Sequence, residues 1–117
     1  MDSILTSVKK MLGIAEEYEH FDSDLIMHIN SVFSILTQLG VGSPNGFMIT
    51  NKKAVWSDFI SDKTNIQIVK SYTYLKVKLL FDPPLGSAVI ESMNRQISEF
   101  EWRINATADY KEEENSK

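Results

Sequence analysis

The sequence predicts an all-α protein, a small bundle of roughly four to five helices whose two long C-terminal helices are joined by a Pro-Pro turn. Three observations lead to this fold class. Apolar residues recur at helical spacing, glycine and proline interrupt that pattern at intervals, and one loop between helices is rich in turn-forming residues. With 117 residues, 43% hydrophobic and 24% charged, the chain has the composition of one folded domain.

Caps and glycines delimit the first two predicted helices. Asp2 or Ser3 can cap a short first helix that stops at Gly13. Asp22 can cap a longer second helix that ends at Gly40. Apolar residues form one stripe on each: Ile4, Leu5, Val8, Met11 and Leu12, then Leu25, Ile26, Ile29, Val32, Phe33, Leu36 and Leu39.

A loop and a short helix follow. Residues 41–51 contain Gly, Ser, Pro and Asn, which predicts a loop projecting from the bundle, with residues 47–49 as a short extended piece pinned to the body. Val55, Trp56, Phe59 and Ile60 then have the spacing of a short amphipathic helix that packs inward.

The segment 65–81 fits two secondary structures. Its many Ile, Val, Thr and Tyr residues and a local alternation allow a strand. A run of about 17 residues exceeds a usual strand, however, and apolar residues share one helical face. We therefore predict a helix, with Ile68, Tyr72, Leu75 and Leu79 opposite Gln67, Lys70, Ser71 and Lys78.

Asp82, Pro83 and Pro84 are predicted to form a structural turn, because a proline ring cannot continue the helix and restricts the residue before it. Ser87 can cap a last helix, whose apolar seam is Ile90, Met93, Ile97, Phe100 and Ile104. Residues 108–117 are acidic and lack large aliphatic side chains. They predict a disordered C-terminal tail after a helical domain of residues 1–107.

Composition excludes several functions. The net charge of −4 disfavours a protein that neutralises nucleic-acid phosphates, and the absence of cysteine removes disulfides and thiolate chemistry. Apolar runs are too short to span a membrane, the N-terminus lacks the order of a secretory signal, and the glycines match no nucleotide-binding pattern. We expect no catalytic residues, no cofactor and no enzymatic activity.

One stretch contains the residue types of a metal site: Glu16, Glu17, Glu19, His20, Asp24 and His28. Asp24 and His28 would share a helical face, but His20 precedes the predicted cap, so the three should not converge. Capping and a solvated acidic loop explain these residues, and we predict no metal.

Charge and aromatic residues give the candidate interface positions. Residues 11–24 carry acidic side chains without Lys or Arg, whereas residues 52–78 are rich in lysine. If these stretches lie on opposite flanks, one copy could contact the next through Glu16, Glu17, Lys52 and Lys53. Intramolecular neutralisation, or two solvated faces, is the alternative. Tyr74 and Trp102 are further candidates, because both lie among polar residues of their helices.

Four segments carry a family resemblance. They are residues 22–40 ending in Gln-Leu-Gly, Trp56-Ser-Asp-Phe59, Tyr74-Leu-Lys-Val-Lys-Leu-Leu-Phe-Asp-Pro-Pro84 and Glu99-Phe-Glu-Trp-Arg103. In order and spacing they resemble the small, helical head-tail connector (adaptor, or head-completion) proteins of tailed bacteriophages.

The resemblance implies a structural virion protein at the head-tail interface of a phage or prophage, assembled in the cytoplasm of the bacterial host. It implies a homo-oligomeric ring of about 12 subunits that sits on the portal protein, extends the DNA channel and receives a downstream connector or tail protein. No specific nucleic acid and no membrane are implied as partners. The alternative is a small helical regulatory or adaptor protein, since the last helix could serve a coiled-coil partner.

Overall fold

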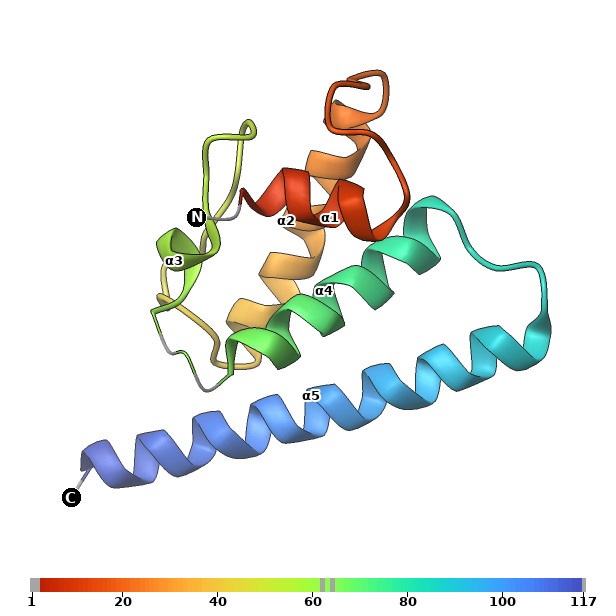
Figure 1. Ribbon diagram of the computed structural model, residues 1–117. Coiled ribbons are helices and arrows are strands. Elements are labelled where there is room, and N and C mark those ends of the chain that lie inside the picture. Colours follow the sequence, from red (N-terminus) through yellow and green to blue (C-terminus); the bar gives the residue numbers. More distant parts are fainter. Residues whose placement is uncertain (1–2, 62, 64, 117) are drawn as a thin grey trace.

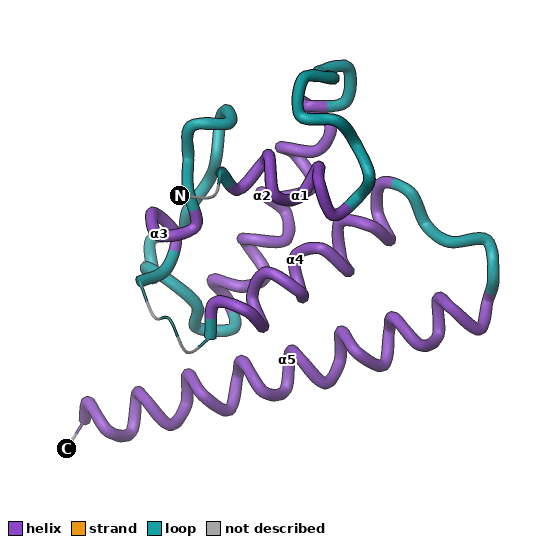
Figure 2. Tube along the Cα trace, in the orientation of Figure 1, coloured by secondary structure: helices purple, strands orange, loops and turns teal. Residues whose placement is uncertain are grey.

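The computed structural model describes the backbone of residues 3–61, 63 and 65–116, and the side chains of these residues as far as residue 107. Its helices are α1 (Ile4–Met11), α2 (Asp22–Gln38), α3 (Trp56–Phe59), α4 (Ile66–Phe81) and α5 (Ser87–Ser116) (Figure 1). The described residues contain no strand, only an isolated bridge between Ser3 and Val55 (Figure 2). The predicted all-α class is confirmed, and segment 65–81 is helical.

The N-terminal helices begin and end close to their predicted limits. The Ser3 hydroxyl accepts a hydrogen bond from the backbone N–H of Thr6 at 3.2 Å, which caps α1. Gly13 and Gly40 follow α1 and α2 with φ of 80° and 96°, angles that strain any residue with a Cβ. Asp22 is the first residue of α2 rather than its cap, because its carboxylate is engaged elsewhere.

The main core lies where α1, α2 and α4 meet and where α3 closes one end. Phe33 of α2 is fully buried, stacks on Phe59 with ring centroids 4.3 Å apart, and meets Trp56 edge-on. The indole N–H of Trp56 donates to the Ser7 hydroxyl at 2.8 Å, so this buried donor is satisfied.

The loop after α2 is fastened to that helix by one side chain. The Asn30 amide donates to the Ile49 carbonyl at 2.9 Å and accepts from the Ile49 N–H at 2.8 Å. Ile49 is buried in the main core. This confirms that the extended piece at residues 47–49 is pinned to the body.

Helix α4 buries two sides instead of one. Val69, Tyr72 and Val77 belong to the main core, whereas Leu75 packs with Met93 and Ile97 of α5. The predicted single face is therefore incomplete, because α4 lies between α2 and α5 (Figure 1).

The turn between α4 and α5 is built as predicted around its prolines. Asp82 caps α4: its N–H donates to the Lys78 carbonyl at 2.9 Å, and its carboxylate pairs with the Lys78 ammonium at 2.8 Å. After Pro83 and Pro84 the chain reverses, and α5 returns along α4 (Figure 1). The 30 residues of α5 span about 45 Å, close to the 49 Å longest dimension of the molecule.

The C-terminus differs from the prediction. Helix α5 continues to Ser116, where a disordered tail was expected from residue 108. Alanine, glutamate and lysine favour helix even without burial, so a missing apolar stripe does not end a helix. The side chains of residues 108–116 lie outside the described residues, and the division into 1–107 and 108–117 stays a prediction.

Candidate protein-interaction surfaces

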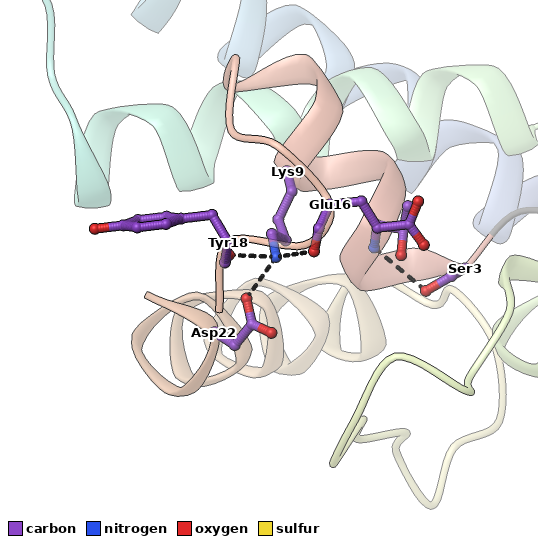
Figure 3. A network of polar contacts seen from close by, with 6 residues as sticks. Ser3, Lys9, Glu16, Tyr18 and Asp22 are labelled. Carbon is purple, nitrogen blue, oxygen red and sulfur yellow. Dashed lines mark hydrogen bonds and ion pairs between the residues drawn. The ribbon is translucent and has the colours of Figure 1, made fainter. Parts of the chain in front are cut away.

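A buried lysine organises the acidic loop between α1 and α2. The Lys9 side chain is 3% exposed, and its ammonium donates to the carbonyls of Glu16 and Tyr18 at 2.8 and 2.7 Å. The same nitrogen lies 2.8 Å from Asp22 Oδ1, a buried oxygen whose counter-charge it supplies (Figure 3). Three oxygens thus surround one ammonium, which fixes the loop backbone while the side chains of Glu16 and Glu17 remain exposed.

The acidic and basic stretches do not lie simply on opposite flanks. Lys52 lines a shallow hollow together with Glu19 and Asp22. Asp22 is neutralised by Lys9, and Lys78 by Asp82. Part of the charge asymmetry seen in the sequence is therefore balanced within the chain, while Lys52 and Lys53 are exposed.

The two candidate aromatic residues have different surroundings. Trp102 is 72% exposed on α5, where Arg103 and Glu99 form an ion pair at 2.8 Å. Tyr74 is half-buried and packs against the small α4–α5 cluster, which includes Ile97. Only Trp102 offers most of its ring to a partner.

The carboxylates and imidazoles of the acidic stretch do not converge on one point. Among the residues described, no three His, Cys, Asp or Glu side chains gather closely enough to hold a metal ion. His20 instead packs against Tyr18 and Phe21, and His28 lies beside Phe81. The two imidazoles are part of an aromatic group at the start of α2.

A partly buried hydrogen bond links α4 to α5. Tyr72 is fully buried, and its hydroxyl donates to Glu101 Oε2 at 2.7 Å. Burial raises the pKa of Tyr72 above its usual value, and the bond to the Glu101 carboxylate raises it further. The phenol therefore stays protonated and positions α5 on the body.

Sequence reasoning missed an apolar surface at the Pro-Pro turn. Leu80, Leu85 and Val89 are all exposed there. Residues 83–90 contain no charged side chain in a chain that is 24% charged, and that uncharged run could have indicated the surface.

A second missed surface is a groove between α2 and the loop that follows it. Two shallow hollows of about 440 and 520 Å³ share Ser34 and Met48 and form one continuous depression. Its lining contains no charged residue: Ser23, Ile26, Met27, Asn30, Ser31, Ser34, Thr37, Gln38, Pro44, Asn45, Gly46, Phe47 and Met48. Ser23, Met27, Ser31 and Ser34 recur along α2, but this spacing matches no recognisable motif.

These features define a class: a small helical protein whose notable surfaces are suited to contact with other proteins. In the part of the chain that is described, no helix is long and apolar enough to cross a membrane. The family model described as phage connector protein matches residues 4–111. The chain belongs to this family.

Family membership establishes the coarse function. The chain is a structural phage protein, a virion component that associates with other phage head or tail proteins, and its family is of a non-enzymatic kind. A search of curated proteins and a search of solved structures each find no match.

Proposed function

We propose that this protein assembles as a ring on the phage portal, where it joins the head to the tail and extends the DNA channel. The observation that carries the proposal is the family match over residues 4–111, nearly the whole chain. Copies made in the host cytoplasm dock to the portal, and a downstream connector or tail protein binds the opposite side of the ring.

The charge of the chain supports a role around DNA rather than on it. A net charge of −4, with Glu16 and Glu17 exposed on the loop that Lys9 holds, repels phosphates. A channel lined by such subunits lets DNA slide, because no set of cations is available to replace its counterions.

Exposed side chains are the proposed contacts with neighbours and with the portal. Trp102 is the strongest of them, since a large, exposed aromatic ring is the type of residue that dominates interface energies. Lys52, Lys53, Glu16 and Glu17 contribute charge complementarity. Tyr74 contributes only the part of its ring that α5 leaves uncovered.

Electron microscopy of the protein mixed with its portal tests the proposal. We expect a closed ring of density on the portal face. A single copy bound to one partner chain would instead indicate the regulatory or adaptor alternative.

Charge reversal tests the lysines in the same assay. The double variant Lys52→Glu, Lys53→Glu should assemble poorly, whereas Lys10→Glu, at another exposed lysine, should assemble normally. Unchanged assembly of the double variant would remove both lysines from the interface.

A further inference from the structure

The segment that joins α4 to α5, residues 82–86, is here called the hinge. Its two consecutive prolines favour an extended backbone and have no N–H to donate. Asp82 bonds back to Lys78 at the end of α4, and the Gly86 carbonyl accepts from the N–H of Ile90 in α5. Within the described part of the chain, no hydrogen bond or ion pair of the hinge runs to α1, α2 or α3. The hinge is therefore fixed only through the two helices that it joins.

Apolar side chains at the hinge remain in water when α5 packs on its own α4. Leu85 is fully exposed, and Leu80 and Val89 on the adjoining helix ends are about half exposed. Their burial by another surface would lower the free energy of the chain.

The seam that holds α5 is narrow, and its two sides fit each other. Leu75 of α4 packs with Met93 and Ile97 of α5, and the Tyr72 hydroxyl donates to Glu101 at 2.7 Å. A released α5 would expose this apolar stripe to water. The α4 of a second copy presents the same residues as the α4 that was left, so it can accept the helix with the same contacts.

We propose that neighbouring copies exchange α5, so that the last helix of each copy packs on α4 of the next one and the hinge bridges the two bodies. This rests on the proposed ring, and it names the contact that builds it. A helix passed in one direction from copy to copy is a heterologous contact, which generates a ring when the rotation closes.

The hinge is long enough for this step. From Phe81, the last residue of α4, to Ser87, the first of α5, an extended chain spans about 20 Å. The thinnest dimension of the molecule is 20 Å. The hinge therefore reaches α4 of a copy that is stacked along this dimension.

Exchange also gives the apolar residues of the hinge a cover. In the ring, the end of each α4 meets the hinge that arrives from the preceding copy and also begins its own departing hinge. Leu80 and Leu85 of one copy then lie near Leu85 and Val89 of another, which removes them from water.

Single cysteines test the exchange, since the natural chain has none. A mixture of Leu75→Cys chains and Ile97→Cys chains, oxidised together with the portal, should give a disulfide-linked dimer on a non-reducing gel, because exchange brings these positions of different copies together. In chains that keep their own α5, each of these cysteines is buried without a second thiol. The double variant Leu75→Cys, Ile97→Cys on one chain is the positive control for the geometry of the bond.

The matched negative control is a mixture of Leu75→Cys and Ser98→Cys chains. Ser98 neighbours position 97 but is exposed on α5, so this mixture should give no linked dimer.

Charge insertion at the hinge is the second measurement. Leu85→Glu changes a side chain that is fully exposed in the single copy, so circular dichroism should show unchanged helix content. Exchange buries this position, and the variant should therefore weaken self-association about tenfold. Ser98→Glu, also at an exposed position, should leave it unchanged.

The outcomes separate the two proposals. If the wild-type chain forms rings on the portal, but the Leu75→Cys and Ile97→Cys mixture gives no linked dimer and Leu85→Glu assembles normally, each α5 stays on its own body. The exchange is then wrong and the proposed function stands. If the wild-type chain forms no ring with its portal, both fall.

Discussion

The body of the molecule and its last helix are held by very different amounts of packing. Among the residues described, sixteen buried side chains form one cluster, most of them from α1, α2, α3 and α4, and Ile4, Leu25, Ile29 and others in it have no exposed surface. Helix α5 contributes Ile104 to that cluster and otherwise packs through Met93 and Ile97 onto Leu75.

This difference separates stability from assembly. The body surrounds the larger core, whereas α5 packs through a narrow seam and leaves Trp102 and Val89 exposed. A helix with few buried contacts opens at a lower free energy than the core. Of the proposed contact residues, Trp102 lies on the less tightly held element, whereas the charged candidates Glu16, Glu17, Lys52 and Lys53 lie on loops of the body.

The same substitution in the two regions measures the difference directly. Ile29→Ala removes a fully buried side chain from the main core and should cost about 4 kcal/mol. Ile97→Ala lies in the small cluster near the surface and should cost about 2 kcal/mol. Chemical denaturation followed by circular dichroism gives both values.

Amide hydrogen exchange shows which helices each substitution destabilises. Ile97→Ala should speed exchange in α5 while leaving α2 protected, and Ile29→Ala should speed exchange in both. Equal costs, or equal loss of protection along the chain, would show that body and last helix unfold as one unit.

Lys9 and Lys10 provide a matched pair at the edge of the body. Lys9→Met leaves Asp22 without its counter-charge and two carbonyls without a donor. Losing one partner of a fully buried ion pair costs about 3–5 kcal/mol. Because Asp22 is 25% exposed, we expect about 2 kcal/mol.

Lys10→Met, at the exposed neighbour, should change stability by less than about 0.5 kcal/mol. Adding Asp22→Asn to Lys9→Met should restore part of the loss, because the uncompensated charge is then removed. Equal stability of the Lys9 and Lys10 variants would show that the acidic loop does not depend on the buried ammonium.

The contacts of Lys9 are a feature that the sequence does not predict. Periodicity, caps and prolines predict every helix of the described chain, including α4, where β-branched residues argued for a strand. Lys9 follows Val8 on an ordinary amphipathic pattern, and nothing local marks a lysine whose partners lie at positions 16, 18 and 22. Such contacts depend on how a loop folds back, which periodicity does not encode.

The candidate interaction surfaces were predictable only in part. Trp102 can be recognised from the sequence alone, because it is a large aromatic residue between the charged residues Glu101 and Arg103. Tyr74 was assigned to a polar face, but α4 buries two sides and α5 partly covers the ring. The groove between α2 and the loop that follows it needs both segments, which Asn30 fastens together, so no single segment reveals it.

The smallest expected effect concerns the bond that joins the two regions. Tyr72→Phe keeps the buried ring but removes the donor to Glu101, and it should cost about 1 kcal/mol. The matched control Tyr18→Phe, at an exposed tyrosine, should change stability by less than about 0.5 kcal/mol. A Tyr72→Phe chain as stable as the wild type would mean that water replaces the hydroxyl at Glu101 without loss.

The pH dependence of stability gives a second readout of the same bond. The pKa of Tyr72 is raised in the folded state, so above the ordinary tyrosine value of about 10 the unfolded chain releases this proton while the folded chain keeps it. The stability that this group provides is complete below that pH and falls as the pH rises towards the folded pKa. Denaturation between about pH 9 and pH 11 should therefore show a steeper loss for the wild type than for Tyr72→Phe. Parallel curves for the two proteins would show that the phenol is not held protonated by its burial and by Glu101, and that the seam of α5 depends on apolar packing alone.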